Sequence, residues 1–273
     1  MTIRFGAFAY ALCAAITLGS AALSYLAFAK RSEKAKNVFV LVLIALNIFQ
    51  HFFKFIIWPT DYGSGFGLKN TAYNMCAFLI ILMPIAYFSK SVALKNFACV
   101  AGTFAGLGAS LIPMWFFGKN PYLWEVIRFY FCHILLFLTA ALPVAFGIVK
   151  IAFKNFLKMP IMFFGAIIVV YINNTLAYFI AGGKAEGLYS HLSAQNPMWA
   201  IRPPEFITAN ETALKIVNAL VPPFFKNVGG MPYMPFLWYI IPFGIALFAL
   251  SLLVCYLFDK NGAREFFNKD KRA

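Results

Sequence analysis

The stretch 122–133 holds side chains that could do chemistry, and it opens a long apolar segment. It contains an acid, a base, a thiol and an imidazole, which are Glu125, Arg128, Cys132 and His133. Ionisable side chains inside a membrane helix are costly unless they face other helices or water, so by default they indicate function. His133 is therefore the first residue for which the sequence predicts a chemical role.

A second polar pattern lies earlier in the chain, where four polar residues recur at helical spacing. Asn47, Gln50, His51 and Lys54 follow one another at i, i+3, i+4 and i+7, so they share one face of a helix. Such a face is unfavourable against lipid, and we expect it to point into a helical bundle. It could serve either to hydrogen-bond neighbouring helices or to line a polar site.

Composition decides the class of protein. The chain has 273 residues, of which 62% are hydrophobic and only 12% charged, values typical of a multi-span membrane protein. The net charge of +14 does not predict a nucleic-acid partner, because the basic residues lie in short segments between apolar ones. The five cysteines all fall in apolar segments without metal-ligand spacing, so we expect no disulfide framework, no metal site and no cofactor.

Seven apolar segments are long enough to cross a bilayer, which takes about 20 residues. They cover 5–29, 38–58, 71–88, 97–117, 126–149, 160–181 and 235–258. The sequence thus predicts an all-α membrane protein in which a compact bundle of seven transmembrane helices forms one domain, 1–258, followed by a basic tail, 259–273. The first segment also resembles a signal peptide, but its apolar run is longer, so we interpret it as a retained span.

The basic residues predict the orientation of the bundle. Fourteen of the 23 Lys and Arg lie in the first, third and fifth loops and the tail, which places these parts in the cytoplasm and the N-terminus outside. We therefore expect a multi-pass protein of the cell membrane with a long outer loop, 182–234. In this loop Thr208 and Glu211 fit a capping box before an apolar stripe, which predicts a short helix lying at the membrane surface or acting as a lid.

Small residues and polar residues together predict how the helices meet. Gly102, Gly106 and Ser110 at four-residue spacing predict close helix packing. Given the predicted orientation, four further residues each lie ~9 to 12 Å below the outer interface at ~1.5 Å per helical residue. These are His51, Cys76, His133 and Asn174. Their similar depth predicts one polar pocket in the outer third of the bundle.

Two segments resemble a known family. Tyr73-Asn74-Met75-Cys76 and the run 124–133 resemble the YwaF-like integral membrane proteins of bacteria, which are similar to the eukaryotic transmembrane-protein-164 acyltransferases. The resemblance implies a compact helical bundle with Cys76 and His133 as the catalytic pair. The chain departs from the family pattern at Asn74, at the Gln50-His51 pair and at the loosely matching Asn173 and Asn174.

With this resemblance, the favoured function is a membrane acyltransferase or lipid hydrolase with membrane lipids as environment and substrate. His133 would deprotonate Cys76, and the thiolate would attack the ester carbonyl of a phospholipid-like substrate. Asn74, Asn173 or Asn174 could donate to the oxyanion. Arg128 could hold a lipid phosphate or could simply extend to the interface.

The alternative function is not enzymatic. A small transporter or ligand-binding bundle could use His51, Lys54, Glu125 and His133 to line a polar cavity for an anion or a proton path. An inverted repeat would favour a transporter, and the sequence has no convincing internal repeat.

Overall fold

The computed structural model describes residues 2–57, 67–113, 116–196, 201–203, 208–228 and 231–269. The end of the predicted segment 38–58, two residues of 97–117, three stretches of the loop 182–234 and the last four residues of the tail lie outside the described residues. Contacts divide the chain into two compact units. Unit 1 comprises Met1–Thr71 and Cys76–Ile151, and unit 2 comprises Ala72–Met75 and Ala152–Ala273.

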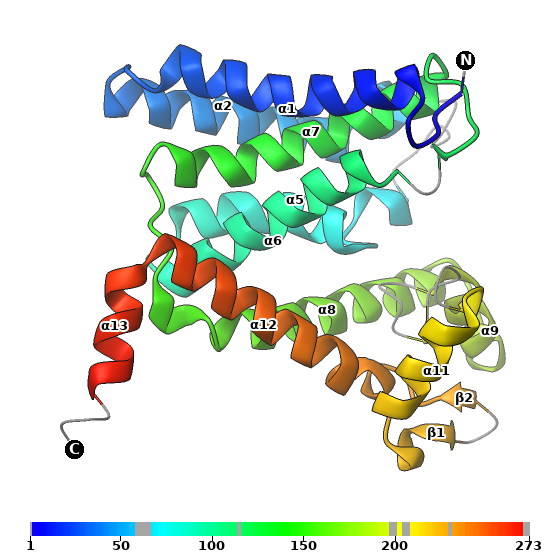
Figure 1. Cartoon of the computed structure of the whole chain (residues 1–273). Helices are drawn as coiled ribbons and strands as arrows, with labels where there is room; N and C mark the ends of the chain where they lie inside the picture. Colours follow the sequence, from blue (N-terminus) through cyan, green and yellow to red (C-terminus); the bar gives the residue numbers. More distant parts are fainter. Residues whose placement is uncertain are drawn as a thin grey trace. The chain divides into compact units, whose positions relative to one another are not determined.

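Unit 1 is helical throughout its described elements (Figure 1). Its long helices are α1 (Phe8–Phe28), α2 (Glu33–Phe52), α5 (Met75–Phe88), α6 (Val92–Leu111) and α7 (Trp124–Ala145), with short α3 (Lys54–Ile57) and the 3-10 turn η1 (Leu68–Asn70). Serine side chains fix two of the starts, because Ser32 Oγ accepts from Ala35 N at the beginning of α2 and Ser91 Oγ accepts from Leu94 N at the beginning of α6.

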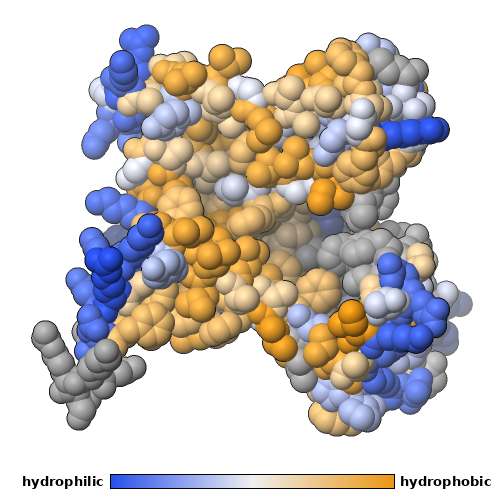
Figure 2. All heavy atoms as spheres, in the orientation of Figure 1, coloured by the Kyte–Doolittle hydropathy of each residue, from blue (hydrophilic) through white to orange (hydrophobic). Residues whose placement is uncertain are grey.

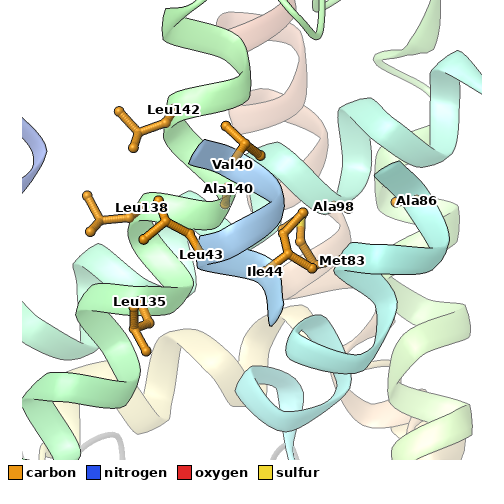
Figure 3. Close-up of a cluster of buried hydrophobic side chains, with 10 residues drawn as sticks. All are labelled: Val40, Leu43, Ile44, Met83, Ala86, Ala98, Leu135, Leu138, Ala140 and Leu142. Carbon is orange, nitrogen blue, oxygen red and sulfur yellow. The ribbon is translucent and has the colours of Figure 1, made fainter. Parts of the chain in front are cut away.

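The core of unit 1 forms around α7. Figure 3 shows side chains of α2, α5 and α6 directed toward those of α7 in one apolar cluster. The cluster consists of Val40, Leu43, Ile44, Met83, Ala86, Ala98, Leu135, Leu138, Ala140 and Leu142, all buried. In lipid, where the surroundings are as apolar as leucine, such packing stabilises a bundle through van der Waals contact rather than through exclusion of water.

Helices α6 and α7 approach each other at glycines, as the four-residue spacing predicted. A Cβ at Gly102 would lie 2.8 Å from the Ala140 Cβ. A Cβ at Gly106 would lie 2.5 Å from the Phe137 backbone N and 2.7 Å from the His133 O. The two backbones can lie this close only because Gly106 has no side chain, so the spacing of small residues positions α7.

Unit 2 contains the remaining helices and a small hairpin (Figure 1). Its helices are α8 (Lys158–Ile180), α9 (Ala185–Gln195), α11 (Glu211–Leu220), α12 (Ile240–Phe258) and α13 (Lys260–Lys269), with 3-10 turns η3 (Phe153–Asn155), η5 (Pro223–Phe225) and η6 (Leu237–Tyr239). Strands β1 (Lys226–Val228) and β2 (Met231–Tyr233) pair antiparallel, with Lys226 opposite Tyr233. Helix α11 confirms the predicted loop helix, but Asn210 and not Thr208 caps it, since Asn210 Oδ1 accepts from Ala213 N at 2.9 Å.

Some helices begin later than the apolar segments predict. Helix α5 starts at Met75 rather than at residue 71, because η1 and the residues after it form a turn. Helix α12 starts at Ile240 rather than at residue 235, because Phe236 adopts a left-handed conformation with φ 64° and η6 follows it. Hydropathy detects apolar residues but not the turns that precede a helix.

The long helices of this α-helical protein have the length and the apolar composition of membrane-spanning helices. Among the described residues, five segments are long and apolar enough to span a bilayer, namely α1, α2, α6, α7 and Phe153–Ile180, which contains α8. A sixth span is counted if Pro242–Phe258 of α12 and Lys260–Asn268 of α13, which are bent by 110° from each other, are taken together as one segment. The face shown in Figure 2 carries large hydrophobic areas, and large apolar side chains such as Leu23 and Ile180 are exposed by 70% and 87%. Such faces are expected against lipid.

Candidate functional site

The polar face of α2 and α3 is buried in unit 1, which confirms its predicted inward direction. Asn47, Gln50, His51 and Lys54 are exposed by only 1 to 4%. The first two are joined to neighbours, since Asn47 Nδ2 donates to Thr139 Oγ1 of α7 at 3.4 Å and Gln50 Nε2 donates to Asn47 Oδ1 at 3.1 Å. Hydrogen bonds of this kind offset the cost of burying amides.

A thiol and a guanidinium of α7 complete this group. The Cys132 thiol donates to Gln50 Oε1 at 2.8 Å, and the Arg128 side chain hydrogen-bonds the same thiol from one helical turn earlier. Lys54 lies within electrostatic range of both Cys132 and Arg128. We call these six residues the α2–α7 polar cluster: Asn47, Gln50, His51, Lys54, Arg128 and Cys132.

Asn70 holds the end of α2 that carries His51. Its Nδ2 lies 3.4 Å from His51 O and 3.0 Å from Phe52 O, and its Oδ1 accepts from Gly67 N at 3.1 Å. The last carbonyls of a helix need partners from outside it, and a buried amide side chain supplies them here. No sequence pattern predicts this role, because Asn70 lies in a turn 18 residues after Phe52 and not on the helix that it caps.

His51 presents an unused donor within the cluster. Its Nδ1 lies 3.5 Å from Lys54 Nζ, and its Nε2 is buried with no partner in good hydrogen-bond geometry, although the ring interacts with the backbone of Asn70 and Thr71. When Lys54 is protonated its ammonium can only donate, so Nδ1 then accepts and the neutral ring carries its proton on Nε2. An unsatisfied buried donor costs about 1–3 kcal/mol. A ligand atom that accepts a hydrogen bond would remove this cost.

Cys76 and His133, the pair implied by the resemblance, have separate surroundings. Cys76 is the second residue of α5 and interacts electrostatically with Cys132. His133 Nδ1 donates to Phe129 O at 2.7 Å, and its ring lies 4.2 Å from the Phe129 ring. Within the described residues no hydrogen bond joins Cys76 to His133. The thiol next to His133 in sequence, Cys132, is the one that reaches the α2 face.

Glu125 lies in an ion pair outside the cluster. Its Oε1 is 2.6 Å from Lys119 Nζ, and the two side chains are exposed by 38% and 42%. An ion pair with this exposure contributes at most about 1 kcal/mol. Glu125 therefore compensates Lys119 near the start of α7.

The three asparagines predicted as oxyanion donors belong to unit 2. Asn174 is buried, and its Nδ2 donates to Tyr73 O at 2.9 Å and to Val170 O at 2.7 Å. This amide thus ties the residues before α5 to α8, and both of its N–H groups are in use. Asn74 and Asn173 are half-buried and have interactions of their own.

Among the residues that the structure describes, no group of three or more His, Cys, Asp or Glu side chains could hold a metal ion. Within the α2–α7 polar cluster, His51 Nε2 is the side-chain donor that lacks a partner in good hydrogen-bond geometry. In comparisons with protein-family models, with curated proteins and with solved structures, nothing matches this chain, so the family resemblance stays a prediction.

Proposed function

We propose that this membrane protein binds a small anionic ligand at the α2–α7 polar cluster. One observation carries the proposal: Lys54, only 4% exposed, lies beside His51, whose buried Nε2 has no partner in good hydrogen-bond geometry. Arg128 adds a second cation within electrostatic range of Lys54. Two basic side chains beside this N–H donor would attract an oxyanion, which could accept a hydrogen bond from His51.

The physical basis is the cost of burying positive charge in a membrane helix. A cationic side chain there is paired or marks the path or site of an ion. An arginine fork and a lysine ammonium both bind phosphate or carboxylate through charge-assisted hydrogen bonds, which are about twice as strong as neutral ones. The neutral amides Asn47 and Gln50 are already bonded to one another, so they would hold the cluster in place rather than bind the ligand.

Calorimetric titration of the purified chain tests this function. Inorganic phosphate is the first probe, followed by sulfate and acetate, with tetramethylammonium as a cationic control. We expect saturable binding of at least one anion and none of the cation. Absence of saturable binding for all three anions would contradict the proposal.

For the membrane arrangement we propose seven spans in the cell membrane, with the N-terminus outside. Helices α5 and α12 would join the five long segments. Helix α5 has 14 residues, or ~21 Å, and needs the turn before it to reach across a ~30 Å hydrocarbon core. This orientation is supported by the fourteen basic residues in the first, third and fifth loops and the tail. A reporter active only outside the cytoplasm should stay silent when fused after Arg272, and activity there would reverse the orientation.

Acyl transfer at Cys76 is a second candidate, favoured by one feature. Cys76 is the second residue of α5, where a helix N-terminus favours a thiolate, whereas the burial of this thiol disfavours it. After incubation with labelled phospholipid, we expect a hydroxylamine-sensitive acyl adduct that Cys76→Ala abolishes, as measured by intact-protein mass. Cys99→Ala, which removes a buried thiol of α6, is the control and should keep the adduct. An adduct that survives in Cys76→Ala would rule out this thiol as the nucleophile.

A further inference from the structure

The last described helix lies across the end of a candidate span. Helix α13 follows α12 after one residue, and the two helices are bent by 110° (Figure 1). If α12 crosses a membrane, a helix at this angle runs close to the membrane plane. The sequence predicted this segment only as a basic tail.

Ring contacts and two hydrogen bonds hold α13 at this angle to α12. Phe266 lies with its ring centroid 5.6 Å from Phe153 and 5.8 Å from Phe156, and Phe267 lies 5.7 Å from Phe153. Asp259, between the two helices, accepts from Phe153 N through Oδ2 and from Gly262 N through Oδ1, both at 2.9 Å. Helix α13 is therefore held against η3.

The exposed surface of α13, η3 and the start of α8 is basic and aromatic. Lys260 and Arg264 of α13 are exposed, as are Lys154 of η3 and Lys158 at the start of α8. Figure 2 shows hydrophilic residues along α13. Phe258 and Phe267, exposed by 62% and 56%, lie on the same two helices. The nearby acid Asp259 is occupied by backbone N–H groups, which leaves Glu265 as the exposed acidic residue of α13.

We propose that the surface formed by α13, η3 and the start of α8 binds the headgroups of anionic phospholipids. A short helix with apolar anchors and basic side chains lies in the interface, with its aromatic residues at the acyl boundary and its cations at the phosphates. Each basic residue near an anionic leaflet contributes about fivefold in affinity. The site is formed by Lys154, Lys158, Lys260 and Arg264, and it does not depend on the cluster in unit 1.

Amide hydrogen exchange of the full chain in bilayers tests the site. The protein is reconstituted into phosphatidylcholine alone and into phosphatidylcholine mixed with phosphatidylglycerol, and exchange is followed over residues 260–268. We expect slower exchange of α13 in the mixed bilayer, with a difference that shrinks at high salt. Equal exchange in the two bilayers would overturn the proposal.

A pair of double variants makes the test specific. Lys260→Gln with Arg264→Gln should weaken the affinity of α13 for the anionic bilayer about 25-fold, at about fivefold for each basic residue, and so remove most of the lipid-dependent protection. Lys184→Gln with Lys215→Gln removes the same charge from exposed positions elsewhere in unit 2 and should leave the protection unchanged. Exchange of α12 reports whether either variant perturbs the fold. Protection that persists in the first variant, or that is lost equally in both, would contradict a site at α13.

Discussion

Lys54→Met should weaken binding of inorganic phosphate at least about 30-fold while the protein becomes more stable. Loss of one partner of a buried charge contact typically costs 2–5 kcal/mol of binding free energy, and about 2 kcal/mol corresponds to a factor of about 30. Methionine has a similar volume and no charge, so it removes the cost of burying the ammonium in unit 1. We expect the free energy of unfolding to rise by about 1–3 kcal/mol.

The opposite signs of the two effects distinguish a binding residue from a structural one. Lys69→Met is the matched control, because Lys69 interacts electrostatically with Lys54 but is itself exposed. It should change phosphate affinity by less than about threefold, as expected for a screened surface charge. If Lys54→Met destabilises the protein and leaves phosphate affinity intact, Lys54 holds the helices together and the binding proposal is wrong.

Gly106→Ala should destabilise unit 1 by about 3 kcal/mol. The new methyl group would lie 2.5 Å from the Phe137 N and 2.9 Å from the Phe137 Cα, which are backbone atoms of α7 that cannot rotate away. Overpacking against flexible side chains usually costs about 1–3 kcal/mol, and a rigid neighbour places this site at the upper end. The measurement is unfolding by dodecyl sulfate in bicelles, followed by circular dichroism.

Gly108, two residues after Gly106 in α6, provides a matched control for this substitution. Gly108 has no atom within 4 Å of the position of an added Cβ. Gly108→Ala should therefore leave stability within about 1 kcal/mol of the wild type, or raise it through better helix propensity. Equal destabilisation by both substitutions would mean that α6 and α7 do not pack through Gly106.

The features that the sequence predicted depend on spacing within one helix. The four-residue spacing of Gly102 and Gly106, and the four- and three-residue spacings of Asn47, His51 and Lys54, define helix faces directly, and both faces are buried as expected. Burial of these faces follows from local geometry together with the cost of exposing polar groups to lipid.

The features that the sequence missed depend on contacts between segments. The rotation of α7 directs Cys132 to Gln50, while His133 bonds back to Phe129 of its own helix. Two residues at the same predicted depth in the membrane can still face different directions around their helices. The predicted depth therefore could not identify Cys132 as the thiol that contacts α2. The bend of α13 likewise depends on Phe266 packing against residues more than a hundred positions earlier.

Nitrogen NMR of the histidine rings tests the central claim most directly. The chain has three histidines, so labelling with ¹⁵N-histidine gives three ring spin systems, and His51→Gln assigns the one in the cluster. The Nε2 resonance of His51 should shift on titration with inorganic phosphate, because the anion accepts the hydrogen bond that this donor lacks. His133, whose Nδ1 donates to Phe129 O, is the internal control and should not move. A His51 resonance that stays unchanged at phosphate concentrations that saturate the calorimetric signal would contradict anion binding at the α2–α7 polar cluster.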